Sequence, residues 1–206
     1  MQYVEIKKLL KNDPLISLNE LRKIDEHFDR RRLNEWQKKD YIKKITKGFY
    51  IFTDIDLNEN ITFNIANKIY APSYISLETA LNYYGIIPES TYLVTSISTR
   101  KTYNFQTNLV SFSYNTIKPQ AFFGYFINKN NNNFKMAYPE KAILDYLYLH
   151  PNIKEISDFD SLRFNKEVIT NILNKSKFTE YLNKFSNKSL NIRAKIFMDF
   201  LKLWST

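Results

Sequence analysis

The sequence of 206 residues contains no cysteine. A chain without cysteine cannot form a disulfide bond, bind a metal through a thiolate or use a cysteine nucleophile. This composition fits a reducing compartment, and it excludes functions that depend on thiol redox chemistry.

Glycine and histidine are also scarce. The three glycines, Gly48, Gly85 and Gly124, are isolated, so the chain lacks a glycine-rich loop that cradles a phosphate. The two histidines, His27 and His150, are too few for a multi-histidine metal site and too far apart in the chain to suggest a histidine-based triad. We therefore expect a protein that is not an enzyme, with no catalytic residue, metal or cofactor.

Long apolar runs are missing as well. No stretch approaches the roughly 18 apolar residues that span a bilayer. The first eleven residues mix Glu5, Lys7, Lys8 and Lys11 with apolar residues and lack the apolar segment of a signal peptide. We expect a soluble, cytoplasmic protein with no membrane partner.

Basic residues are abundant and unevenly placed. The 30 Lys and Arg exceed the 21 Asp and Glu, which gives a net charge of +9. Residues 1–55 hold 13 basic and 9 acidic residues, residues 56–150 hold 7 and 6, and residues 151–206 hold 10 and 6. The excess is densest in residues 22–50, with 10 basic and 5 acidic residues. Such clustering is typical of a polyanion binder, although a solvated charged face explains the charge alone equally well.

The first 25 residues predict two short helices. Tyr3, Ile6 and Leu9 have helical spacing, and Asp13-Pro14 ends that helix because the residue before proline avoids the α region. Ser17-Leu18-Asn19-Glu20 has the pattern of a capping box and predicts a helix from about residue 18 to 25.

A basic helix and a basic hairpin follow. Asp29 is a candidate cap for a helix over residues 30–39. Three consecutive arginines lie in its first turn, where their positive charge opposes the helix dipole. An anion bound at this end, such as a DNA phosphate, would relieve the conflict. Strand-like runs at 42–45 and 49–52 flank Thr46-Lys47-Gly48. This order predicts a winged helix-turn-helix, in which the third helix enters the major groove of double-stranded DNA. The alternative is that these charges are only the exposed ends of a small helical unit. The candidate DNA-binding residues are Arg30, Arg31, Arg32, Asn34, Gln37, Lys38, Lys39, Lys43, Lys44 and Lys47.

The remainder predicts a mixed α/β body after a linker at residues 54–60. Helices are expected from Leu77 to Gly85, from Pro139 as a buried helix, and at about 165–175, 177–186 and 190–204, the last with Ile192 on its apolar face. Strands are expected at 92–98, 103–105, 109–114, 122–127 and 134–137, with a turn at 128–133.

Two groups of polar residues in the body are candidate sites. Glu140, Lys141 and Asp145 are the nearest approach to a metal-dependent nuclease, but one helix carries all three and no strand supplies a partner. Arg100 and Lys101 end a polar strand and form a possible secondary anion site, for which a solvent-facing turn is the simpler interpretation.

These motifs, in this order, resemble the AbiEi family of antitoxins, which are predicted transcriptional regulators of viral defence systems. The resemblance covers about residues 3 to 150 and is weaker beyond. It rests on Lys47-Gly48-Phe49-Tyr50, on Ser76-Leu77-Glu78-Thr79-Ala80-Leu81, on Thr99-Arg100-Lys101-Thr102 and on Pro139-Glu140-Lys141-Ala142-Ile143-Leu144-Asp145.

The resemblance implies the antitoxin of a toxin–antitoxin system for phage defence, which represses its own promoter and counters a nucleotidyltransferase-like toxin. In this family the antitoxin need not bind its toxin, so no toxin interface is predicted. We expect an α+β protein with a winged helix-turn-helix domain at 1–55 and a mixed α/β antitoxin domain at 56–206 that has a helical C-terminal end. Self-association of the body stays open. The main alternative function is a metal-dependent nuclease with a DNA-binding head, and a second, weaker alternative is that the body is a protein-interaction module for an unrelated partner.

Overall fold

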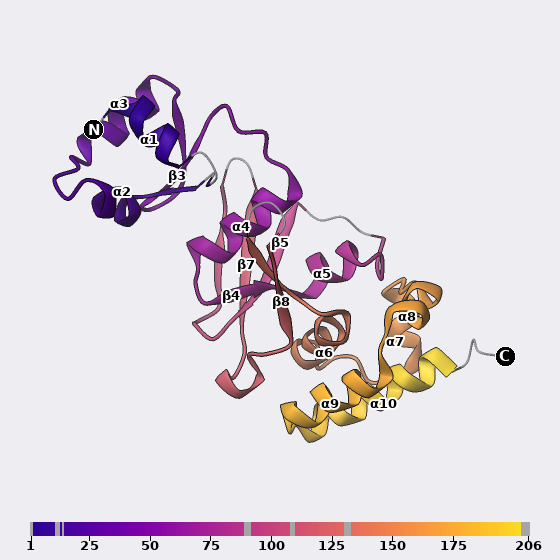
Figure 1. Cartoon of the computed structure of the whole chain (residues 1–206). Helices are drawn as coiled ribbons and strands as arrows, with labels where there is room; N and C mark the ends of the chain where they lie inside the picture. The colour runs from indigo at the N-terminus through magenta and orange to yellow at the C-terminus, as the bar shows by residue number, and fades with distance from the viewer. Residues whose placement is uncertain are drawn as a thin grey trace.

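The computed structural model describes residues 2–10, 13, 15–88, 92–107, 110–129 and 133–202, which form a mixed α and β protein with two sheets. The first 55 or so residues form a small unit at one end of the molecule (Figure 1). A six-stranded sheet with flanking helices makes up the centre, and the C-terminal helices lie at the other end (Figure 1).

The N-terminal unit contains three helices and a three-stranded antiparallel sheet. Its elements are α1 (Tyr3–Leu9), β1 (Leu15–Ser17), α2 (Leu18–Ile24), α3 (Arg31–Lys38), β2 (Ile42–Thr46) and β3 (Phe49–Phe52). The sheet order is β1-β3-β2. The three helices and the hairpin agree with the sequence-based prediction, whereas β1 was not predicted.

Local hydrogen bonds explain where two of these helices begin. The Ser17 hydroxyl accepts the amide of Glu20 at 3.1 Å, and the Glu20 carboxylate accepts the amide of Ser17 at 3.3 Å, which confirms the capping box. The Asp29 carboxylate accepts the amide of Arg31 at 2.9 Å, so α3 starts one residue later than predicted. Gly48 closes the hairpin with a φ of +84°, a conformation that side chains with a Cβ rarely adopt.

Both faces of the three-stranded sheet carry buried apolar side chains. On one face Ile16 and Tyr50 join the core of the N-terminal unit, which also contains Leu33 and Trp36. On the other face Leu15, Ile45 and Ile51 belong to the large core of the body. Lys68 of the body also forms an ion pair with Asp13. The unit and the body are therefore packed together through the sheet.

The body is built on a mixed sheet with the order β6-β7-β5-β4-β9-β8. Its strands are β4 (Ser73–Ile75), β5 (Leu93–Ser98), β6 (Tyr103–Phe105), β7 (Ser111–Thr116), β8 (Tyr125–Asn128) and β9 (Phe134–Ala137). β5 runs parallel to β7, and β4 runs parallel to β9, while the other neighbours are antiparallel.

Helices cover the two faces of this sheet. α4 (Glu59–Ile69) packs on one face, where the Tyr114 hydroxyl donates to the carbonyl of Ala66 at 2.7 Å. α5 (Leu77–Tyr83) and α6 (Pro139–Leu149) pack on the other face, where the Tyr74 hydroxyl reaches Asp145 of α6. α6 lies between the six-stranded sheet and the C-terminal helices (Figure 1).

The C-terminal end is helical, as predicted. It consists of α7 (Ile156–Ser161), α8 (Lys166–Ile172), α9 (Lys175–Phe185) and α10 (Lys188–Lys202), of which α9 and α10 pack on α6. Among the helices of the described ranges, none has both the length and the apolarity needed to cross a bilayer.

Several elements differ from the prediction. α4, β4 and α7 were not predicted, and α4 takes up residues 59 and 60 of the expected linker. β7 starts at Ser111 instead of residue 109, and β8 starts at Tyr125 instead of residue 122, after a 3₁₀ turn at Pro119–Ala121. Leu109 and residues 130–132 of the expected turn lie outside the described residues. In α10 the apolar face is rotated from the expected one, because Ile192 is 64% exposed whereas Arg193 is buried.

Candidate nucleic-acid interface

The exposed side of α3 carries much of the predicted site. The hydrophobic residues Leu33 and Trp36 point into the core of the N-terminal unit. Arg31, Asn34 and Lys38 follow one another at helical spacing and are exposed. These three side chains therefore share the face of α3 that is turned away from the core.

The flanks of α3 are less open. The Gln37 side chain is half-buried and donates to the carbonyl of Leu33 in its own helix at 3.2 Å. Arg32 is also half-buried and lines a groove of about 410 Å³ between α1 and α3, together with Lys39. The rings of Tyr3 and Tyr41 stack at 4.6 Å beside this groove. Arg30 precedes the helix and is exposed.

The β2–β3 hairpin adds three cations. Lys43 and Lys44 are exposed on β2, between the buried Ile42 and Ile45, and Lys47 is exposed in the turn. β2 packs against α3, and Ile42 shares a core with Leu33 and Trp36. Lys44 pairs with Tyr50 and so lies on the α3 face of the sheet, whereas Lys43 pairs with Ile51 and lies on the opposite face. Of the two β2 lysines, Lys44 is therefore the one that adjoins the cations of α3.

Most of these cations form no ion pair with a carboxylate. Within the described ranges, no ion pair within 4.0 Å involves Arg30, Arg31, Lys38, Lys39, Lys43, Lys44 or Lys47, whereas Lys7 of α1 pairs with Asp54 and Lys68 of α4 pairs with Asp13. Glu35 is an exposed acidic residue on the same helix, next to Asn34. The surface has the unneutralised positive charge that attracts a polyanion.

No family model and no curated protein matches this sequence.

The three residues named for the nuclease alternative lie in the interior of the body. Lys141 and Asp145 have fully buried side chains and form an ion pair across one turn of α6. The Asp145 carboxylate also accepts the hydroxyls of Ser76 at 2.8 Å and Tyr74 at 3.0 Å, and the Lys141 ammonium donates to the Tyr74 hydroxyl at 2.8 Å. Glu140 is 2% exposed. All three side chains are closed to solvent, and Lys141 and Asp145 bind each other.

Burial changes the proton affinities of this buried network. Removal from water lowers the pKa of Lys141 and raises the pKa of Asp145, while their mutual attraction acts in the opposite direction on each. Burial also raises the pKa of Tyr74, and the nearby Asp145 adds to this rise. Among the described residues, no group of three or more His, Asp or Glu side chains is arranged to hold a metal ion.

Glu140 completes a separate contact to the C-terminal helices. Its carboxylate accepts the amide of Asn174 at 3.0 Å and lies 3.5 Å from the ammonium of Lys177. The sequence motif Pro139–Asp145 thus connects the central helix to β4 through Asp145 and to α9 through Glu140. These contacts hold elements of the fold together.

The residues of the candidate secondary anion site lie in the turn between β5 and β6. Arg100 and Lys101 are both exposed, as predicted. The Arg100 guanidinium lies 4.1 Å from the ring centre of Tyr70, which the sequence did not associate with this turn. Tyr103 follows with 51% of its surface exposed. The aromatic neighbours come from the end of α4 and from β6, so only the tertiary structure brings them to the two cations.

Proposed function

We propose that this protein binds double-stranded DNA through α3 and the β2–β3 hairpin, as a winged helix-turn-helix regulator, and that it serves as the antitoxin of a toxin–antitoxin system. The observation that carries the DNA-binding part is the group of exposed cations on α3 and β2 without carboxylate partners in the described chain. Because DNA carries one negative charge per about 1.7 Å of helix axis, a basic helix and a neighbouring basic strand suit its backbone.

The order of elements supports a winged-helix mode of binding. α2 and α3 follow one another closely, and the hairpin that comes next packs against α3. In this mode α3 lies in the major groove, where Arg31 and Asn34 reach base edges while Lys44 and Lys47 contact phosphates. Gln37 contributes little to base contacts in this proposal, since its amide bonds to its own helix.

The antitoxin part rests on the resemblance to the AbiEi family described above. It implies that the DNA is the protein's own promoter and that the functional partner is a nucleotidyltransferase-like toxin. The same assignment makes the protein a cytoplasmic regulator that needs no cofactor.

DNA binding is tested with fluorescence-labelled duplex from the region upstream of the gene. Reversing Arg30, Arg31 and Lys38 to glutamate should weaken binding at least about 100-fold, because repulsion replaces the attraction of these cations to several phosphates. Arg32 is left unchanged because it has contacts within the protein. For the parent protein, log affinity should fall with log salt by roughly 0.9 per neutralised phosphate.

A matched control reverses three exposed lysines in the C-terminal helices, Lys175, Lys188 and Lys195, which gives the same change in net charge. This control should bind the duplex within a fewfold of the parent. Equal binding by the α3 variant and the parent refutes the α3 assignment, and an equal decrease in both variants shows a dependence on net charge only.

The antitoxin assignment has its own test. Co-expression with the product of the adjacent gene should restore growth if that product is a nucleotidyltransferase-like toxin. Cleavage of DNA or RNA with Mg²⁺ or Mn²⁺ contradicts it in favour of a nuclease if the cleavage disappears in Glu140→Ala or Asp145→Ala while urea unfolding shows that the variant is still folded.

A further inference from the structure

A long central part of the chain contains no acidic residue. Between Glu89 and Glu140 there are five basic residues and no Asp or Glu, and this stretch supplies β5 to β9. Residues 56–150 as a whole hold 7 basic and 6 acidic residues, so their total charge does not show that the acidic residues lie outside this stretch. Exposed Arg100, Lys101 and Lys118 therefore produce a positive potential that no carboxylate of the same stretch neutralises.

The turn between β5 and β6 is held rigidly by hydrogen bonds to its backbone. The Arg100 amide donates to the Ser98 hydroxyl at 3.1 Å, and the Arg100 carbonyl accepts the Thr116 hydroxyl at 2.7 Å. The Lys101 carbonyl accepts the Tyr70 hydroxyl at 2.6 Å. A turn fixed in this way gives up little conformational entropy when a ligand binds to its side chains.

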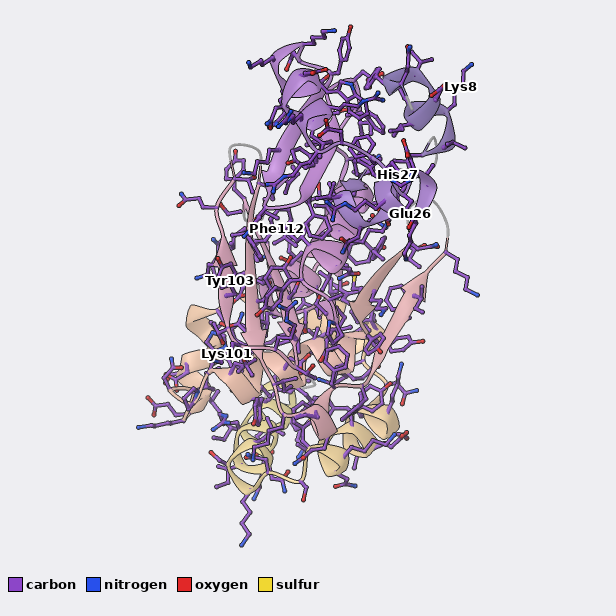
Figure 2. All side chains as sticks on the ribbon, turned by 90° about the vertical axis from the view of Figure 1, so that its left-hand side faces the viewer. Lys8, Glu26, His27, Lys101, Tyr103 and Phe112 are labelled. Atoms are coloured by element: carbon purple, nitrogen blue, oxygen red, sulfur yellow. The ribbon has the colours of Figure 1, made fainter. Side chains whose placement is uncertain are left out.

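An aromatic surface adjoins the two cations of this turn. The ring of Tyr103 lies nearly parallel to that of Tyr70, with centres 5.9 Å apart and planes inclined by 13°. Phe105 contacts the Tyr103 ring edge-to-face at 4.6 Å. These contacts fix the orientation of Tyr103, whose surface is 51% exposed. Tyr103 and Lys101 lie on neighbouring parts of the body strands in Figure 2.

We propose that the turn formed by Arg100, Lys101 and Tyr103 binds single-stranded nucleic acid, with a base stacked on the Tyr103 ring and phosphates beside Arg100 and Lys101. An exposed aromatic ring next to cations on a rigid strand is the arrangement by which proteins bind single strands without reading sequence. Duplex DNA does not offer this contact, because its bases are stacked on their neighbours. The inference goes beyond the duplex binding proposed for the N-terminal unit and does not depend on it.

The test measures fluorescence anisotropy of labelled oligo(dT) and oligo(rU) of about 12 nucleotides with the full-length protein, at low salt of about 50 mM. Tyr103→Ala should weaken binding about 5- to 100-fold, which corresponds to the stacking of one base. Tyr103→Phe keeps the ring and should bind within about twofold of the parent. Lys101→Glu should weaken binding and reduce the salt dependence by about 0.7 in the log–log slope for each phosphate that the variant no longer neutralises.

The variant with Arg30, Arg31 and Lys38 reversed separates this surface from α3. It should keep its affinity for both oligonucleotides while its affinity for duplex DNA falls. A stronger affinity for one oligonucleotide identifies DNA or RNA as the ligand, and equal affinity shows that the sugar is not read. The proposal is overturned if the parent binds neither oligonucleotide, or if Tyr103→Ala binds as well as Tyr103→Phe.

Discussion

Separating Lys141 from Asp145 should produce two variants whose stability responds to pH in opposite directions. In Lys141→Met, the Asp145 carboxyl stays buried with the Ser76 and Tyr74 hydroxyls. Burial raises its pKa above the usual 3.8, so the folded state holds a proton that the unfolded state has released. The folded state then binds more protons, and the free energy of unfolding should fall as pH rises above 3.8, by up to about 1.4 kcal/mol per pH unit.

In Asp145→Asn, the reverse applies. Burial lowers the pKa of Lys141 below 10.5, and the carboxylate that counteracts this effect is gone. The unfolded state keeps its lysine protonated up to about 10.5, so it binds more protons than the folded state in this window. Stability should therefore rise with pH towards 10.5, again by up to about 1.4 kcal/mol per unit.

The size of the effect at neutral pH follows from the geometry. Removing one partner of a fully buried ion pair typically destabilises a protein by about 3 to 5 kcal/mol, whereas replacing both partners changes much less. The double variant Lys141→Met/Asp145→Asn is therefore the matched control and should show no slope from this pair. Urea unfolding of the four proteins from about pH 4.5 to 9.5 measures these free energies. Parallel pH profiles for the two single variants refute the reasoning.

Two further predictions concern other positions. Gly124 has a φ of +72°, and a Cβ at this position would lie 2.9 Å from the Tyr181 ring. The Gly124→Ala variant should therefore have a free energy of unfolding that is lower by about 2 to 4 kcal/mol, measured by urea denaturation. An unchanged midpoint of unfolding contradicts the close packing. Two backbone amides donate to the Asp158 carboxylate and lower its pKa below 3.8, so its stabilising contribution is present above this value and disappears as pH falls through the lower folded pKa. An NMR titration that gives Asp158 an ordinary pKa contradicts this assignment.

Elements with local signals could be predicted from sequence. The Ser17–Glu20 capping box marked the start of α2, and alternation in residues 103–105 and 134–137 predicted β6 and β9 with their observed bounds. By contrast, β1 has only three residues and depends on pairing with β3, which follows it by more than 30 residues. α4 has Ile61 where a capping box would have a glutamate, and it buries a polar Asn64, so neither capping nor periodicity marked it clearly.

The sequence predicted which residues make up the candidate interface, but it predicted only part of their arrangement in space. Charge clustering pointed to Arg31, Lys38 and Lys43, and the structure places all three on exposed surface. The half-burial of Arg32 depends on the position of α1, which the sequence of α3 does not encode. A lysine and an aspartate four residues apart on a helix usually form an exposed pair. The spacing of Lys141 and Asp145 therefore did not predict that both side chains are buried.

The two-sided burial of the small antiparallel sheet has a consequence for stability. Leu15, Ile45 and Ile51 would face water in an isolated fragment of the first 55 residues, and each such side chain is worth about 1.5 to 3 kcal/mol when buried. The N-terminal unit is thus held to the body by an apolar contact as well as by the connecting chain. A fragment cut after residue 55 would lose this contact, so it should be less stable than the same residues in the full chain.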